Sequence, residues 1–100
     1  MNITGQCRDG VLTLHFSGEL DHHAARAAIH ALSERIDAFL PRACVIDLGE
    51  LRFMDSAGVA LILRAERLMR ELEGRLSVRS APAQPRRVLM ASGMGRLMED

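Results

Sequence analysis

The sequence contains no tryptophan, no tyrosine and only three phenylalanines, Phe16, Phe39 and Phe53. A platform that stacks nucleic-acid bases needs exposed aromatic rings, so this class of protein is not expected. An excess of charge is also missing, because 13 Lys+Arg balance 13 Asp+Glu and the formal net charge is zero. Proteins that bind nucleic acid usually carry a basic excess. We therefore expect no direct nucleic-acid partner.

Cysteines and long apolar runs are scarce as well. The two cysteines, Cys7 and Cys44, are too few for a disulfide scaffold and are expected to be buried free thiols. The first residues have neither a charged segment nor an apolar one, so no signal peptide is expected. The longest apolar run, 57–63, ends at Arg64 and falls far short of the ~20 residues that cross a membrane. These absences predict a cytoplasmic protein with no membrane span.

The chain has 100 residues, of which 48% are hydrophobic, enough for one core. A typical domain has ~100–150 residues, so we expect a single domain over residues 1–100. Separate domains for a cofactor and a substrate would not fit into this length.

Hydrophobic periodicity predicts elements in the order β-β-α-β-α-β-α, which is an α/β fold. The expected strands are 2–8, 11–17, 43–48 and 75–79, and the expected helices are 22–40, 57–73 and 86–92.

Local sequence features define several of these boundaries. Asp9-Gly10 between two alternating runs predicts a hairpin with a type I′ turn. Asp21 is expected to cap the first helix, after a bend at 18–20. The nearly continuous apolar run 43–48 predicts a central strand covered on both faces, and 51–54 is expected to be a loop.

The predicted helix 57–73 begins with two turns that are apolar on every side. Such a helix start is either deeply buried or partly covered by a partner. A central helix that packs over a sheet favours burial.

Ser56 lies in a strand–turn–helix setting that resembles the nucleophile elbow of hydrolases. Met54 stands where the elbow has its first glycine, and all four histidines precede Ser56 in the chain. The elbow's triad runs serine, acid, histidine, so this order is impossible here. We therefore expect no enzymatic activity.

Metal and nucleotide sites are also not expected. His22 and His23 are adjacent, so on a helix they point about 100° apart, and His30 lies two turns beyond His23. The 93–95 segment Gly-Met-Gly has no following Lys-Ser/Thr and is not a P-loop.

The segment Asp55-Ser56-Ala57-Gly58 has two interpretations from the residues alone. Ser56 can simply be a helix N-cap, for which serine is a favoured residue. Alternatively, it is an exposed phosphoacceptor at a helix N-terminus, where the dipole and free N–H groups tolerate an added anion.

Two segments together carry a resemblance to a known family. Gly18-Glu19-Leu20-Asp21-His22-His23, followed by Phe53-Met54-Asp55-Ser56-Ala57-Gly58, is similar to the STAS domain. The likeness is strongest to the bacterial anti-sigma factor antagonists and extends from the opening hairpin to Ser92-Gly93. It implies the STAS fold, a mixed β-sheet with an N-terminal hairpin and helices packed on it. Relatives usually continue into a final strand and helix, so a shortened C-terminus is expected.

The resemblance implies a non-enzymatic switch in transcription regulation, with sporulation as one candidate process. Such proteins bind an anti-sigma factor that is also a serine kinase, and thereby free the sigma factor. Phosphorylation of the serine that matches Ser56 switches binding off, and a phosphoserine phosphatase resets it. No cofactor is implied, because ATP or ADP would belong to the partner. The residues expected to line or shape the contact surface are Glu19, Asp21, Met54, Asp55, Ser56 and Gly58.

Two other functions stay open at this point. Short STAS proteins also serve as subunits of lipid-transporter ATPase complexes, which predicts stable association with a transporter and no phosphate on Ser56. A small enzyme that uses Ser56 or Asp55 is the third possibility. The match at Asp21-His22-His23 favours the antagonist.

Overall fold

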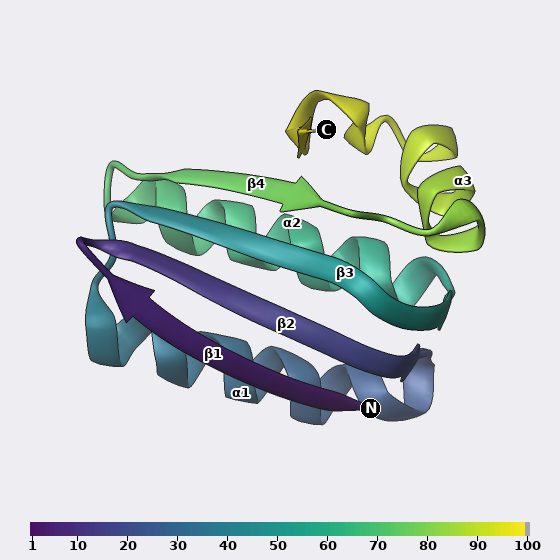
Figure 1. Cartoon of the computed structure of the whole chain (residues 1–100), viewed down its shortest axis with the longest axis horizontal. Coiled ribbons are helices and arrows are strands. Elements are labelled where there is room, and N and C mark those ends of the chain that lie inside the picture. The colour runs from purple at the N-terminus through teal and green to yellow at the C-terminus, as the bar shows by residue number, and fades with distance from the viewer. Residues whose placement is uncertain (100) are drawn as a thin grey trace.

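A five-stranded mixed sheet in the order β1-β2-β3-β4-β5 forms the scaffold of the computed structural model, which describes residues 1–99 (Figure 1). The β1–β2 pair is antiparallel, and the other neighbouring pairs are parallel. The strands are β1 (Asn2–Arg8), β2 (Val11–Leu20), β3 (Ala43–Met54), β4 (Arg75–Arg79) and β5 (Met98–Glu99). The helices are α1 (His22–Phe39), α2 (Ser56–Glu71), α3 (Ala83–Ala91) and the 3-10 helix η1 (Met94–Leu97). The expected α/β class, with its N-terminal hairpin and mixed sheet, is confirmed.

The turn between β1 and β2 has the predicted geometry. Asp9 and Gly10 both have positive φ, 54° and 79°, as a type I′ turn requires. The flanking residues Arg8 and Val11 are paired in the antiparallel ladder.

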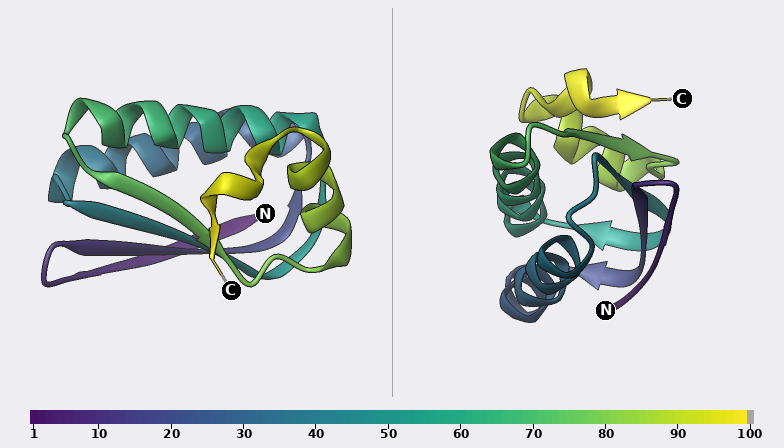
Figure 2. Two further views of the ribbon diagram at one scale, coloured as in Figure 1. Left: turned by 90° about the horizontal axis from the view of Figure 1, so that it is seen from above. Right: turned by 90° about the vertical axis from the view of Figure 1, so that its left-hand side faces the viewer.

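Both long helices lie on the same face of the sheet, and within residues 1–99 no helix covers the opposite face (Figure 2). Right-handed crossovers that advance in one direction along a sheet place their helices on one side. In β3 the buried residues Cys44, Ile46 and Leu48 therefore alternate with the half-buried Val45 and Asp47. The expectation that this strand is covered on both faces is wrong.

The two central strands run further than the sequence predicts. Residues 18–20 were expected to bend, but they continue β2, and 49–54 continue β3. The ladder between them shifts register on both sides of Gly18, whose φ of 94° suits an irregular strand. Leu20 pairs with Met54 at the end of this extension, and both are fully buried.

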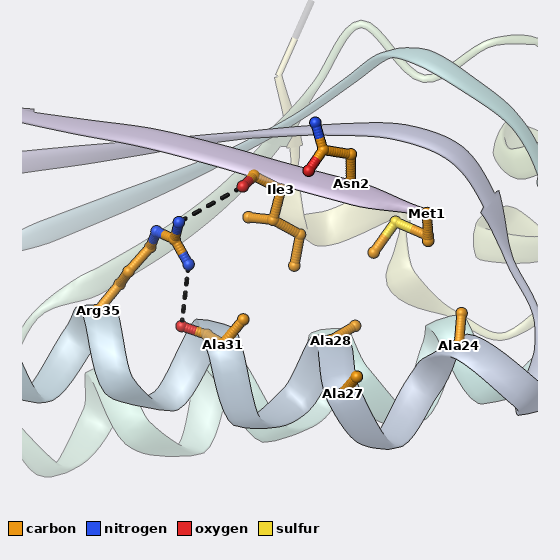
Figure 3. A pocket seen from close by; sticks show the side chains of 8 residues that line it. All are labelled: Met1, Asn2, Ile3, Ala24, Ala27, Ala28, Ala31 and Arg35. Atoms are coloured by element: carbon orange, nitrogen blue, oxygen red, sulfur yellow. Dashed lines mark hydrogen bonds between the residues drawn. The ribbon is translucent and has the colours of Figure 1, made fainter.

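The N-terminal half of α1 packs beside the edge strand β1. Small side chains line a shallow hollow there, and Arg35 reaches across from the helix (Figure 3). Its guanidinium donates hydrogen bonds to the carbonyl of Ile3 and to that of Ala31, both at 3.4 Å. Arg35 therefore ties an exposed sheet edge to the helix.

The buried face of α1 is narrow. Ala28, Leu32 and Ile36 are buried, whereas the apolar residues at the end of the helix, Phe39 and Leu40, are 51% and 64% exposed. The helix ends at Phe39 because the next residue adopts the left-handed region, with φ of 45°. This turn directs the last two apolar side chains away from the sheet.

The first two turns of α2 are divided between core and surface. Gly58, Leu61 and Ile62 are buried, but Ala60 and Leu63 are exposed. Burial therefore accounts for only one side of this apolar stretch. The helix itself spans Ser56–Glu71, slightly offset from the predicted 57–73.

The C-terminal segment closes the sheet edge beside β4. The helix α3 begins at Ala83, earlier than the predicted 86, and a short final strand, β5, pairs with β4. Arg96 of η1 donates from both terminal guanidinium nitrogens to Glu66 of α2, one of them at 3.0 Å. The hydrogen bond from Arg96 holds the pKa of Glu66 below its usual value. The segment is thus tied to the second helix as well as to the sheet.

Candidate functional site

The candidate site lies where the carboxyl ends of β2 and β3 meet the first turns of α1 and α2 (Figure 1). Leu20 and Met54 end the two strands as a pair, and an aspartate follows each of them. Asp21 leads into α1, and Asp55 leads into α2. The topology therefore brings together the two segments that carry the family resemblance.

Asp55 binds the starts of both helices. Its Oδ1 accepts the Ala57 N–H of α2 at 2.8 Å, and its Oδ2 accepts the His22 N–H of α1 at 3.0 Å. The ring Nδ1 of His22 also lies 3.6 Å from Oδ2. One carboxylate thus satisfies free N–H groups of two helices that start far apart in the chain.

Ser56 is the first residue of α2 and not its cap. The interpretation of Ser56 as an N-cap is wrong, because Asp55 holds that position. The Ser56 side chain is exposed, and its hydroxyl makes no hydrogen bond within residues 1–99. The hydroxyl is therefore open to a reagent that approaches from solvent.

Asp21 caps α1 as predicted. Its Oδ1 accepts the N–H groups of His23 and Ala24, both at 3.0 Å. The hydrogen bond from Ala24, with smaller contributions from His23 and His22, lowers the pKa of Asp21 below its usual value. The rings of His22 and His23 lie close together, with centroids 4.0 Å apart and planes tilted by 37°.

Met54 and Gly58 form the floor of the site. Met54 is fully buried, and a Cβ at position 58 would lie 2.5 Å from its Cγ. Only glycine lets the first turn of α2 approach the methionine this closely. These two predicted site residues therefore shape the surface from below and present no side chain to solvent.

The role of Gln84 is apparent only in the folded structure. Its side-chain amide makes two hydrogen bonds of 2.8 Å to the backbone of Met54, accepting the N–H and donating to the carbonyl. The first turn of α3 thus fixes the last residue of β3, directly before Asp55. A single glutamine in a loop–helix junction carries no pattern from which this contact could be predicted.

The surface around Ser56 combines acidic and apolar groups. Glu19 is exposed and pairs in register with Phe53, which is 42% exposed. His22 and His23 are exposed on the adjoining turn of α1. The structure therefore gathers all the predicted site residues at one end of the sheet, with Glu19 and Ser56 fully on the surface.

Residues 1–99 contain no group of three or more His, Cys, Asp or Glu side chains that could hold a metal ion. None of the described helices has the length and apolar character needed to span a membrane.

Comparison with known proteins identifies the family. The family model described as "Mlab, STAS domain" matches residues 3–99. The chain belongs to the STAS domain family.

Similar proteins define the group within that family. An anti-sigma F factor antagonist from Paenibacillus polymyxa is 34% identical over 89 residues, which cover 89% of this chain and 76% of the relative. One from Lysinibacillus sphaericus is 33% identical with the same coverage. These relatives place the chain among the anti-sigma factor antagonists.

Solved structures agree with this placement. The anti-sigma factor antagonist SpoIIAA in its unphosphorylated form matches with a TM-score of 0.88 and 28% identity, over 99% of this chain and 87% of that one. SpoIIAA of Bacillus in its phosphorylated form matches with a TM-score of 0.78 and 28% identity, over 99% and 90%. An anti-sigma factor antagonist from Mycobacterium paratuberculosis gives 0.85 and 25%, over 97% and 81%.

Proposed function

We propose that this chain, in its unphosphorylated form, binds an anti-sigma factor serine kinase and thereby releases a sigma factor. Phosphorylation of Ser56 switches this binding off, and a phosphoserine phosphatase restores it. The observation that carries the proposal is that Asp55 and Ser56 have separate roles at the start of α2. Because Asp55 caps the helix, the exposed Ser56 hydroxyl is available for phosphoryl transfer.

The position of Ser56 suits a switch that leaves the fold intact. A phosphate adds a charge of about −1.5 to −2 at a helix N-terminus, where the dipole favours an anion. The same phosphate beside Asp55 makes this surface strongly negative. An unpaired dianion in a protein interface costs several kcal/mol, which corresponds to an affinity loss of about 100- to 1,000-fold.

We assign the contact surface to the exposed groups around this serine. Glu19 and Phe53 would meet the partner directly, and Asp21 and Asp55 would add acceptor oxygens at the two helix starts. Met54 and Gly58 would determine how close the first turn of α2 lies to the end of β3. The nucleotide used for phosphorylation would belong to the kinase, and the exchange would take place in the cytoplasm.

Phosphosite mapping is the first test. Mass spectrometry of the protein recovered from its native cells should find one phosphate, on Ser56. An unmodified Ser56 under every growth condition would contradict the proposed switch.

Partner capture from the same cells is the second test. Ser56→Ala should retain the kinase permanently, and Ser56→Asp should bind it at least about 100-fold more weakly. Ser92→Asp adds the same charge at an exposed serine of α3's C-terminal end and should bind like the wild type. Equal affinity of the Ala and Asp variants at position 56 would exclude the proposal.

A transporter subunit is the second candidate. It is retained because the matching family model is described as a Mlab STAS domain and not as an antagonist. This function predicts stable co-purification with a lipid-transporter ATPase and equal recovery of that complex with Ser56→Ala and the wild type.

A further inference from the structure

The uncovered face of the sheet contains a hollow that the proposed switch does not use. Its volume is about 480 Å³, and its polar lining is Gln6, Arg8, Asp9, Thr13, Arg42 and Arg79. These residues come from β1, its turn, β2, β4 and the segment before β3. The lining residues Arg8, Asp9 and Val11 belong to the hairpin, and Arg42 directly precedes β3, whereas Ser56 follows the other end of β3.

Asp47 positions the guanidinium of Arg79. Its Nε donates to Oδ2 of Asp47 at 3.1 Å, and Oδ1 of Asp47 accepts the Gly49 N–H at 2.8 Å. Burial alone would raise the pKa of Asp47, but the hydrogen bonds from Gly49 and Arg79 outweigh it and lower that pKa. The carboxylate therefore stays ionised and positions the guanidinium, while His15 approaches it from the other side at 3.5 Å.

Arg42 is fixed in a similar way at the hairpin end. One terminal nitrogen donates to the Asp9 carbonyl at 2.8 Å. Its stem lies against Gly10, where a Cβ would come within 2.9 Å of Nε. The close approach of Arg42 thus depends on the glycine of the turn.

Each of these arginines is anchored by one nitrogen and keeps further N–H groups without a partner. Within residues 1–99, the terminal nitrogens of Arg79 make no hydrogen bond, and the Arg8 side chain makes neither a hydrogen bond nor an ion pair. Three arginines and one aspartate, Asp9, line the hollow, and Asp47 binds Arg79. The lining has more donors than acceptors.

We propose that this hollow binds a small multivalent oxyanion, a polycarboxylate or a polyphosphate. Guanidinium groups match carboxylate and phosphate oxygens through paired hydrogen bonds. Three of them in one lining, from β1, β4 and the segment before β3, fit an anion that carries two or more such groups. The volume lies within the range of small-molecule sites, about 300–1,000 Å³, and no aromatic ring lines the hollow, so recognition rests on the charged groups. The site is independent of Ser56 and of the proposed switch.

Titration of the whole chain with citrate and with pyrophosphate at low ionic strength tests the proposal. Amide chemical shifts should move at Gln6, Thr13 and Arg79 and stay constant along α2. Within residues 1–99, the guanidinium that Arg8→Gln removes makes no hydrogen bond or ion pair, so the variant should fold normally and bind at least about fivefold more weakly. Arg79→Gln should weaken binding by a similar factor. Arg64→Gln removes an exposed arginine of α2 on the other face and is the matched control.

The two probes separate the sources of the anion. Saturation by citrate alone supports a carboxylate ligand, saturation by pyrophosphate alone supports a phosphate ligand, and either result supports the site. Absence of saturation by both probes up to about 10 mM, roughly tenfold above a 1 mM dissociation constant, would overturn it. Equal weakening by Arg64→Gln and Arg8→Gln, or shifts spread along α2, would also overturn it.

Discussion

At the scale of single residues, Asp55 connects Ser56, the proposed phosphoacceptor, to both long helices. Each of its carboxylate oxygens accepts an N–H from a different helix, and Ser56 is its direct neighbour. The geometry of the first turn of α2 therefore depends on a bond to α1. A change at Asp55 should alter stability and the orientation of Ser56 together.

Asp55→Ala should lower the free energy of unfolding by about 1–3 kcal/mol, because N–H groups of two helices lose their acceptor. Asp55→Asn keeps one acceptor oxygen and should cost less. Urea unfolding measures both. Asp37→Ala, at an exposed position of α1 without hydrogen bonds, is the control and should stay within about 0.5 kcal/mol of the wild type. A similar loss for Asp37→Ala would refute the double-cap explanation.

Gln84→Ala should destabilise the chain by about 1–2 kcal/mol, since it leaves the N–H and carbonyl of Met54 without their partner. Gln84→Glu keeps the acceptor for the N–H but replaces the donor by an oxygen that repels the carbonyl. Hydrogen exchange should therefore show the Met54 amide better protected in the Glu variant than in the Ala variant. Equal protection in both would mean that the amide pairing contributes little.

The lowered pKa of Asp47 predicts how the stability of the protein changes at acid pH. Its folded-state pKa lies below the ordinary value of 3.8. The ionised carboxylate therefore contributes stability above that pH, and the contribution is lost as the pH falls through the folded pKa. Asp47→Asn should be less stable than the wild type at pH 6, and the difference should shrink toward pH 2. A difference that is independent of pH would contradict this account.

At the scale of elements, the approach of α2 to β3 is set by one small residue. Gly58 faces the buried Met54 side chain, so any added Cβ must displace the end of β3 or the first turn of the helix. The Ser56 surface is built on this contact. The packing of Gly58 against Met54 therefore determines how close the first turn of α2, which carries Ser56, lies to β3.

Gly58→Ala should cost about 1–3 kcal/mol through overpacking. In a double-mutant cycle, Met54→Ala should relieve part of that loss, so the combined cost should be smaller than the sum. Gly95→Ala is the control, because a Cβ there meets only the flexible Met90, which is 56% exposed. Strict additivity of the changes at 54 and 58 would show that the two residues do not clash.

At the scale of the whole molecule, all the long helices cover one face of the sheet and leave the other open. The core lies between the sheet and α1 and α2, and it contains the thiol of Cys44. Burial raises the pKa of this thiol to about 12. The expectation that both cysteines are buried is wrong for Cys7, which lies on the edge strand β1 and is only half-buried. The two cysteines therefore report different parts of the fold.

A thiol reagent at pH 8 should modify Cys7 in the native protein and leave Cys44 unmodified. In concentrated guanidinium chloride both should react, because unfolding exposes Cys44 and returns its pKa to the ordinary range. The rate of Cys44 modification would then follow global unfolding. Rapid reaction of Cys44 in the native state would show that the core opens locally. The free energy of that opening would be well below the free energy of global unfolding.

Short-range interactions explain what the sequence by itself determined. The order of the elements, the Asp9-Gly10 turn and the cap at Asp21 each depend on residues within a few positions of one another. The alternation of Leu12, Leu14 and Phe16 similarly fixed the core face of β2. The two segments that carry the family resemblance then located Ser56 and its neighbours.

Contacts between distant residues decided the rest. The extension of β2 and β3 depends on pairing between strands, and Leu20 and Met54 lie on opposite sides of α1 in the chain. Asp55 reaches His22 across 33 positions, and Gln84 reaches Met54 across 30. Ser56 does not cap α2, because Asp55 is the N-cap in the folded chain. Hydrophobic periodicity and turn preference depend on residues that are close together in the sequence. Only the tertiary structure could therefore bring these distant groups together.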